Sequence, residues 1–213
     1  MTRRLLGKAL RRLREDPVAV LRLAVAAARG LVTVVYYRIF ARRVSIKLPF
    51  YVYGGWVRIT GPGSVRIDRG CLVEVSVFDS MSIVTLSSEA RVEIGPRCRL
   101  AGVTIRCAHS VVIEGQVMTG HCLIQDQEMV SAGLHLAARP EQRRPIRIGA
   151  GAWITRQVVI GPGADIGNES VVGVGSLCFR VTVPPGTVTV GSPVMRSVPI
   201  SSLLAMNVSN GAQ

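Results

Sequence analysis

Aromatic residues and acidic side chains are both scarce in this chain of 213 residues. Aromatics make up 5% of the sequence, so a broad globular core built on aromatic rings is not expected. The 22 glycines and many small aliphatic residues favour a narrow core of β-branched side chains instead. Only 13 acidic residues oppose 26 basic ones, which gives a formal net charge of +13. The length allows one or two domains and one continuous core.

The sequence also lacks Cys-x-x-Cys spacing and a secretory signal. Its cysteines are odd in number and lie far apart, at Cys71, Cys98, Cys107, Cys122 and Cys178. Structural zinc sites usually draw on closely spaced ligand pairs, so no metal site is expected here. We expect a reduced, cytoplasmic protein with buried thiols.

The positive charge is concentrated near the N-terminus. Up to Lys47 there are twelve basic residues against two acidic ones, Glu15 and Asp16, which leaves a charge of +10. The rest of the chain is therefore nearly neutral. A basic arm of this kind favours an anionic surface as partner. It has few polar residues for reading bases and no nucleic-acid-binding motif, so we expect no nucleic-acid partner.

Residues 1–43 form this arm, and their pattern predicts two helices separated by Pro17. Leucines recur at helical spacing among arginines in residues 3–14. The second segment, 18–41, is mostly apolar, but Arg29 and its neighbouring glycine interrupt the centre of a span that would need about 20 apolar residues.

Three interpretations of the second helix remain open. It could lie in the headgroup layer at the inner face of a membrane, cap the open end of a repeat domain, or span the bilayer. We favour the first, a peripheral contact with an anionic membrane, in which Tyr36, Tyr37 and Phe40 act as interfacial anchors.

From about Val44 the pattern changes to short alternating strands broken by glycine and proline. The clearest stretch has an aliphatic or thiol side chain at regular intervals of six: Ile148, Ile154, Ile160, Ile166, Val172 and Cys178. Three such units could complete a triangular coil with one side chain pointing inward on each side. Glycine directly after the inward residue tolerates the corner backbone. The sequence therefore predicts a mainly β fold, a β-solenoid over residues 44–198, followed by a tail at 199–213.

Upstream the repeat is looser. The positions that keep the six-residue spacing are Ile94, Leu100, Val112, Met118 and Ile124. Arg106 falls where an aliphatic residue is expected, which predicts a one-residue slip near Ile105 or within 111–113. The pattern disappears at 129–145, so we expect a loop ejected from the solenoid there. Long excursions from a regular scaffold are commonly functional.

The segment from Ile146 to Ile154 closely resembles the hexapeptide-repeat acyltransferases. Three further segments match the closing coils of that family: 172–176, 183–186 and 190–194. The resemblance implies a left-handed parallel β-helix, a homotrimer, and acetyl-CoA bound along the C-terminal coils between neighbouring subunits. The sugar and polysaccharide O-acetyltransferases are the most similar branch, which implies a sugar or glycan acceptor.

The resemblance also implies a histidine that takes the proton of the attacking hydroxyl, since histidine titrates near neutrality. Asp126 stands where the family has an acidic residue, but no histidine follows within four positions. His135 in the ejected loop and His121 on a coil edge are the candidate bases, and Asp126 could orient one of them. Each could instead be an ordinary coil or loop residue. His109 is expected to be structural.

The donor side of the resemblance is more complete. Small residues and one tryptophan occupy the positions that hold pantetheine in the family: Ala152, Trp153, Gly173, Val174, Gly175 and Ser176. Arg180 and Arg196 stand where basic residues pair with the phosphates of CoA. Simple packing of the tryptophan and solvated arginines are the alternatives. Thr155-Arg156 replaces the family's usual glycine and small residue.

Three functions are compatible with these patterns. The leading hypothesis is an acetyl-CoA-dependent O-acetyltransferase acting on a sugar or nascent surface polysaccharide. The second is a non-catalytic scaffold or assembly subunit that has lost its base. The third is a zinc hydratase of the γ-carbonic anhydrase type, but the three histidines lie 12 and 14 residues apart, whereas that family has two closely spaced ones.

Overall fold

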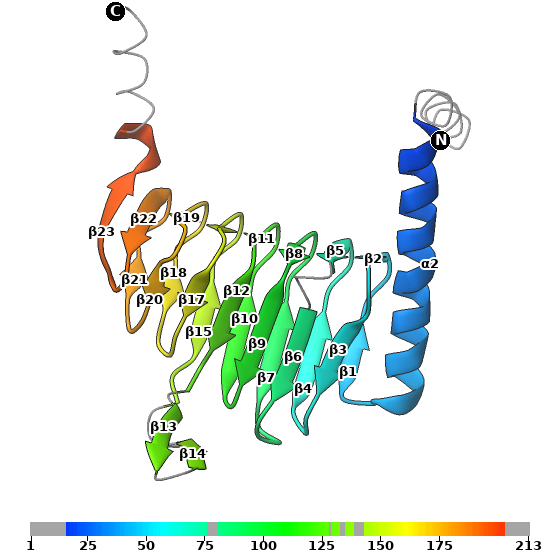
Figure 1. The fold of residues 1–213 in the computed structure, drawn as a ribbon, viewed down its shortest axis with the longest axis horizontal. Coiled ribbons are helices and arrows are strands. Elements are labelled where there is room, and N and C mark those ends of the chain that lie inside the picture. The colour runs from blue at the N-terminus through cyan, green and yellow to red at the C-terminus, as the bar shows by residue number, and fades with distance from the viewer. Residues whose placement is uncertain (1–15, 76–80, 128, 133–134, 139–142, 203–213) are drawn as a thin grey trace, which may run out of the picture.

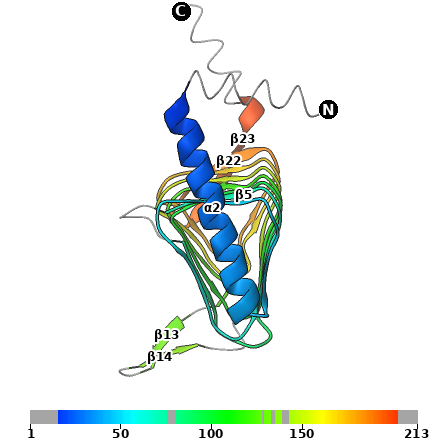
Figure 2. The same ribbon diagram turned by 90° about the vertical axis from the view of Figure 1, so that its right-hand side faces the viewer.

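The computed structural model describes residues 16–75, 81–127, 129–132, 135–138 and 143–202. The helix predicted at 3–14 and most of the C-terminal tail lie outside these residues. The described chain forms a β-solenoid with one long helix at its N-terminal end (Figure 1). Viewed along its axis, the solenoid is a triangle with a parallel sheet on each side (Figure 2).

The three sheets, A, B and C, are each built from one strand per coil. Sheet A contains, in spatial order, β1 (Val44–Ile46), β4 (Ser64–Ile67), β7 (Arg91–Ile94), β10 (Ser110–Ile113), β15 (Ile146–Ile148), β18 (Asp165–Ile166) and β21 (Thr182–Val183). Sheet B contains β2 (Phe50–Tyr53), β5 (Cys71–Glu74), β8 (Arg99–Ala101), β11 (Met118–Thr119), β16 (Trp153–Ile154), β19 (Val171–Val172), β22 (Thr187–Gly191) and the antiparallel β23 (Val194–Pro199). Sheet C contains β3 (Val57–Thr60), β6 (Met81–Thr85), β9 (Val103–Cys107), β12 (Cys122–Gln125), β17 (Val158–Ile160) and β20 (Leu177–Cys178).

The chain visits sheets A, B and C in turn, and the six strands of sheet C define six complete coils. Coil 1 consists of β1, β2 and β3, and coil 6 of β18, β19 and β20. All pairs between successive coils are parallel. The predicted β-helix is therefore confirmed.

Each two-residue strand of coils 5 and 6 points one side chain into the centre of the triangle, and the four- and five-residue strands of the earlier coils point two or three inward. The six predicted positions from Ile148 to Cys178 are all fully buried. Neighbouring residues alternate between buried and outward-facing, as the two-residue period of a strand requires. The core is thus a column of stacked aliphatic side chains, and the repeat prediction is confirmed over this stretch.

Coils 3 and 4 follow a different register from the predicted one. Ile105 is buried in place of Arg106, which confirms the predicted slip. The prediction that Val112 and Met118 point inward is wrong, because Ile113 and Thr119 take those positions and Met118 is 40% exposed. The path from sheet B to sheet C is five residues long in these coils, from Thr119 to Ile124 in coil 4, instead of six.

The segment that interrupts the repeat leaves the solenoid at the corner between sheets C and A. It differs from the irregular loop expected, because β13 (Met129–Ala132) and β14 (His135–Ala138) pair as an antiparallel hairpin that projects from the solenoid (Figure 1). The chain rejoins the solenoid at Arg144, whose N–H donates to the carbonyl oxygen of Asp126 at 3.0 Å.

Helix α2 (Pro17–Phe40) lies across the open end of coil 1 (Figure 2). It begins at Asp16, whose carboxylate accepts from the N–H of Ala19 at 2.9 Å, with proline in the first turn. Its buried stripe is Ala26, Gly30, Thr33 and Tyr37. These mostly small side chains let the helix approach strand β2 closely, so α2 covers the first coil.

Candidate active site

Most of the predicted site residues lie at two corners of the solenoid. The first, called the B–C corner below, joins sheet B to sheet C. It contains Gly120 and His121 in coil 4, residues 155–157 in coil 5, and residues 173–176 in coil 6. The second, called the C–A corner, joins sheet C to sheet A and carries the hairpin β13–β14.

His121 is exposed at the B–C corner, and its backbone is tied to the next coil. Its carbonyl oxygen accepts from the N–H of Gln157 at 2.6 Å, and the carbonyl of Arg156 accepts from Gly175 at 3.2 Å. A Cβ on Gly120 would lie 3.0 Å from Cγ of Arg156. Glycine before the histidine therefore lets the arginine side chain pass close to the corner, and coils 4, 5 and 6 are joined there.

Trp153 lies on the outward face of sheet B, one coil further along. Its register partners are Met118 in coil 4 and Val171 in coil 6. Trp153 is 48% exposed, whereas Ala152 beside it is fully buried. Trp153 therefore offers an apolar surface to a ligand beside the corner of His121, while Ala152 contributes packing.

The turn of coil 6 combines exposed backbone with a buried hydroxyl. Val174 is 65% exposed, and a Cβ on Gly175, whose φ is +71°, would have no atom within 4 Å. The Ser176 hydroxyl is buried, donates to the carbonyl of Gly173 at 2.7 Å and accepts from the N–H of Gly191 at 3.3 Å. The surface at this turn is therefore mainly backbone, which an extended ligand could approach.

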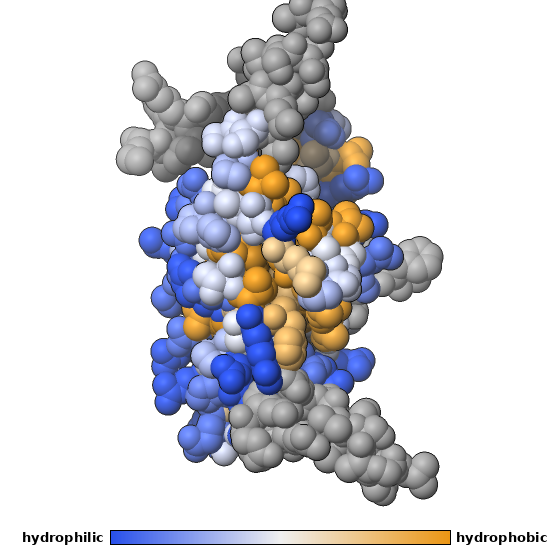
Figure 3. Space-filling model, turned by 90° about the vertical axis from the view of Figure 1, so that its left-hand side faces the viewer, coloured by the Kyte–Doolittle hydropathy of each residue, from blue (hydrophilic) through white to orange (hydrophobic). Residues whose placement is uncertain are grey.

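An apolar groove continues from this turn towards the C-terminal end. It is lined by Val188, Val190, Gly191, Pro193, Met195, Arg196 and Val198. A Cβ on Gly173 would lie 2.2 Å from Cγ1 of Val190, so the groove adjoins the coil 6 turn. Apolar side chains are exposed on this end of the solenoid beside hydrophilic ones (Figure 3). The small residues, the groove and Arg196 fit a donor with an apolar arm and an anionic end.

Asp126 at the C–A corner is fully buried and has a structural set of contacts. Its carboxylate accepts from the N–H groups of Ala108, His109 and Ser110 at 2.7–2.8 Å. The thiol of Cys107 donates to the same carboxylate at 3.3 Å. Burial, together with the charge of Asp126, raises the pKa of Cys107 to about 12. Asp126 therefore fixes the turn of the preceding coil.

The remaining predicted residues of the C–A corner are His135 and Arg180. His135 is the first residue of β14 and stands opposite Ala132 in the hairpin. Arg180 has a φ of +47° and its guanidinium lies 5.1 Å from the ring centre of Phe179. The backbone N–H of Arg180 donates to the carbonyl oxygen of Pro162 at 3.1 Å.

The structure thus brings some predicted residues together and separates others. His121, Trp153, the turn 173–176 and Arg196 follow one another along sheet B and its corner. Asp126 and Arg180 lie at the opposite end of the sheet C strands. Asp126 follows His121 by five residues along an extended strand, which places it about 16 Å from the B–C corner. Sequence reasoning missed Gln157, whose φ of +57° points its N–H at His121.

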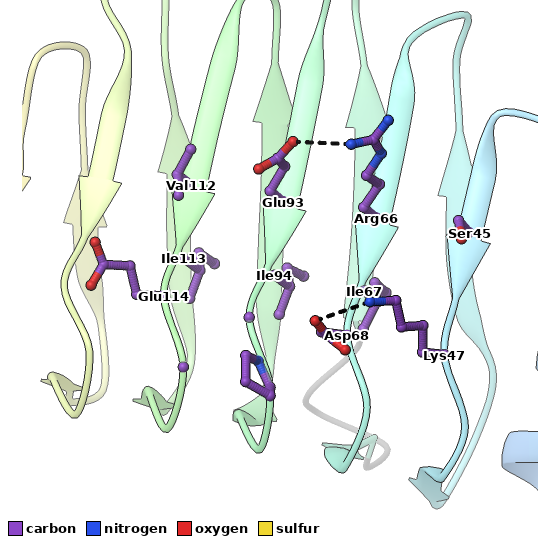
Figure 4. A pocket seen from close by; sticks show the side chains of 13 residues that line it. Ser45, Lys47, Arg66, Ile67, Asp68, Glu93, Ile94, Val112, Ile113 and Glu114 are labelled. Atoms are coloured by element: carbon purple, nitrogen blue, oxygen red, sulfur yellow. Dashed lines mark hydrogen bonds and ion pairs between the residues drawn. The ribbon is translucent and has the colours of Figure 1, made fainter.

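A second depression lies on the outer face of sheet A (Figure 4). Charges of opposite sign face each other there across successive coils, with Lys47 beside Asp68 at 3.3 Å and Arg66 beside Glu93 at 3.8 Å. The N–H of Arg69, aided by Lys47, lowers the pKa of Asp68. These ion pairs join neighbouring coils.

Within the part of the chain that the structure describes, no group of three or more His, Cys, Asp or Glu side chains is placed to hold a metal ion. All five cysteines are buried and free. The expected buried thiols are therefore confirmed.

No protein-family model and no curated protein matches the sequence. Solved structures do match. The product of the BC4754 gene of Bacillus cereus, which is classed as an acetyltransferase, is 17% identical, with a TM-score of 0.52 over 79% of this chain and 86% of the other. The polysialic-acid-specific acetyltransferase NeuO is 18% identical, with a TM-score of 0.51 over 73% and 70%. This chain therefore has the β-solenoid fold of the hexapeptide-repeat acetyltransferases.

Proposed function

We propose that this protein is an acetyl-CoA-dependent O-acetyltransferase whose acceptor is a hydroxyl of a sugar or nascent surface polysaccharide. The observation that carries the proposal is the exposed His121 beside Trp153 and the turn 173–176, which opens on the apolar groove with Arg196. Two proteins of similar fold are classed as acetyltransferases, and one of them acts on polysialic acid. We further propose that the enzyme is a cytoplasmic homotrimer.

The chemistry requires a base, an activated acyl group and an oriented hydroxyl. The imidazole of His121 takes the proton of the acceptor hydroxyl as its oxygen attacks the thioester carbonyl. The new C–O bond forms, the C–S bond breaks, and the proton passes from the imidazolium to the sulfur of CoA. The products are the O-acetylated acceptor and free CoA, so no other reactant is needed.

The donor lies along the coil 6 turn in this proposal. The exposed backbone at Val174 and Gly175 accommodates the amide-containing arm of acetyl-CoA, and Trp153 provides an apolar wall. Arg196, exposed in strand β23, pairs with the phosphates at the other end of the donor. Ser176 holds the turn, since its hydroxyl is already engaged by Gly173 and Gly191.

Two histidine variants at different corners test the mechanism. Acetyl-CoA binding is measured by calorimetry, and turnover by CoA release with a panel of sugars and glycans. His121→Ala should lower kcat by about 10²–10⁴-fold with little change in donor affinity. His135→Ala is the matched comparison and should change kcat by only a few fold. Loss of activity in His135→Ala alone would show that His135 in the hairpin, and not His121, is the base.

A non-catalytic scaffold remains the second candidate. One observation favours it, because the Asp126 carboxylate is occupied by the turn 108–110. A folded protein that binds no acetyl-CoA and turns over no acceptor would establish this alternative. Activity retained in both histidine variants would instead reject a histidine base.

A further inference from the structure

The face of helix α2 that points away from the solenoid is apolar over its whole length. The buried stripe, from Ala26 to Tyr37, marks the side that packs on coil 1. The residues on the opposite side of the helix are Leu21, Ala24, Ala28, Leu31, Val32, Val35 and Ile39, and all are exposed. Leu21 and Ile39, near the two ends, are 65% and 63% exposed.

This distribution is the reverse of that in a helix that caps a core in water. Such a helix buries its large apolar residues and exposes polar ones. Here the buried positions are mostly small, and large side chains lie outside. Phe40 (73% exposed) ends the helix, and Trp56 (70%), which lines one hollow with Val32 and Tyr36, extends the apolar surface beyond it. Large apolar side chains gathered on one exposed face mark an interaction site.

The surrounding charge identifies the partner. Residues 16–60 contain seven basic side chains and one acidic side chain, Asp16, which caps the helix. Arg22, Arg38, Arg42 and Arg58 are exposed around the apolar face. Apolar side chains rimmed by arginines match the headgroup layer of an anionic bilayer. Two copies meeting through this end would bring their positive charges together, which disfavours a second copy as partner.

The packing of α2 indicates that the helix lies on the membrane. Among the described residues it is the one helix long and apolar enough to cross a bilayer. However, Gly30 packs directly on the Phe50 carbonyl, since a Cβ there would lie 1.7 Å from its oxygen. The Tyr37 hydroxyl also bonds to Val57 and Ile59 in β3. A spanning helix would have to abandon both contacts.

We propose that the N-terminal end of the solenoid docks on an anionic bilayer, with α2 in the plane of the headgroups and the solenoid axis along the membrane normal. Coils stack about 4.8 Å apart, and a packed helix adds about 10 Å, so His121 in coil 4 stands about 25 Å from the outer face of α2. The inference about the acceptor rests on the proposed function: the acetylated hydroxyl belongs to a lipid-anchored glycan of several sugar units, and a sugar attached directly to the lipid stays below the site.

Vesicle flotation of the full chain tests the docking. The protein should float with phosphatidylcholine–phosphatidylglycerol vesicles and remain behind with phosphatidylcholine alone. Val32→Glu/Val35→Glu should reduce the bound fraction at least tenfold. Met195→Glu/Val198→Glu, which adds the same charges at the opposite end, should float like the parent protein. Equal flotation of both double variants would overturn the docking face. A doubled particle mass that is lost in Val32→Glu/Val35→Glu, without vesicle binding, would assign the face to a second copy.

The two tryptophans report the orientation, because Trp56 and Trp153 are the only ones in the chain. With Trp153→Phe, anionic vesicles should shift the emission of Trp56 to the blue, and brominated lipids should quench it. With Trp56→Phe, the emission of Trp153 should not change on vesicle binding. Quenching of both tryptophans would show that the solenoid lies flat and overturn the proposed orientation.

Acceptors on the same vesicles test the height of His121 above the membrane separately from the acetyltransferase activity. Lipid-linked glycans of several units should be acetylated at least tenfold faster than a lipid-linked monosaccharide, whereas the two sugars free in solution should differ less. Equal rates on vesicles would overturn the proposed height of the site above the membrane, but the acetyltransferase proposal would still stand. An absence of transfer to every acceptor would reject the proposed function, and flotation would still decide the docking.

Discussion

The hydroxyl of Tyr37 accepts a hydrogen bond from the backbone N–H of Ile59 at 2.8 Å. The same hydroxyl donates to the carbonyl of Val57 at 3.0 Å. Strand β3 is an outer strand of sheet C, so no strand of the described chain pairs with these backbone groups. One buried tyrosine on α2 thus satisfies two backbone groups at the edge of sheet C, which an open sheet would otherwise expose.

Tyr37→Phe should destabilise the protein by about 1–3 kcal/mol, because it leaves a buried donor and a buried acceptor without their partner. Urea denaturation at neutral pH measures the loss. Burial raises the pKa of Tyr37, so its contribution is present at neutral pH and is lost as pH rises above about 10. The stability of the variant should not show this fall above about pH 10. An unchanged urea midpoint of unfolding would show that water replaces the hydroxyl.

Gly30→Ala tests the close approach of α2 to strand β2. Alanine alone would favour the helix by about 1 kcal/mol. Because the new Cβ would meet the Phe50 oxygen at 1.7 Å, we expect a net loss of at least about 2 kcal/mol. Leu31→Ala, at the exposed next position, is the control and should change stability by less than about 0.5 kcal/mol. A stabilised Gly30→Ala protein would mean that the helix does not rest on the coil.

The accuracy of the sequence prediction depended on the regularity of each coil. From Ile148 to Cys178 every side of the triangle takes six residues, so aliphatic spacing alone located the core. In coil 4 the corner is shortened at Gly120 and His121, which turns polar Thr119 inward and apolar Met118 outward. Hydrophobicity then indicates the wrong face, because a one-residue shift reverses every side chain of a strand.

The candidate site was predictable where residues lie one coil apart. Trp153 and Val171 differ by one coil length, so the repeat itself implies that they are neighbours. The partners of Asp126 could not be predicted in the same way. Its carboxylate accepts from the turn at 108–110, which follows the preceding coil. The resemblance had suggested that this carboxylate orients a histidine instead.

Asp126→Asn separates a structural role from a catalytic one. The amide can present only one oxygen to three converging N–H groups, and its NH₂ would face a donor. We expect a loss of about 3 kcal/mol in unfolding free energy. The kcat per folded molecule should stay within a few fold of the parent value. A large fall in kcat with unchanged stability would instead indicate that Asp126 orients the base.

The cysteines provide a test of the whole core, because burial raises the pKa of Cys122 and Cys178, like that of Cys107, to about 12. A neutral, buried thiol is a poor nucleophile. Because all five thiols are buried, the native protein should resist Ellman's reagent at pH 8, and all five should react in urea. Because these folded pKa values exceed the unfolded one, the thiols stabilise the fold fully below about pH 8.5, and this contribution is lost as pH rises towards 12. Rapid labelling of even one equivalent in the native state would show that a coil opens locally.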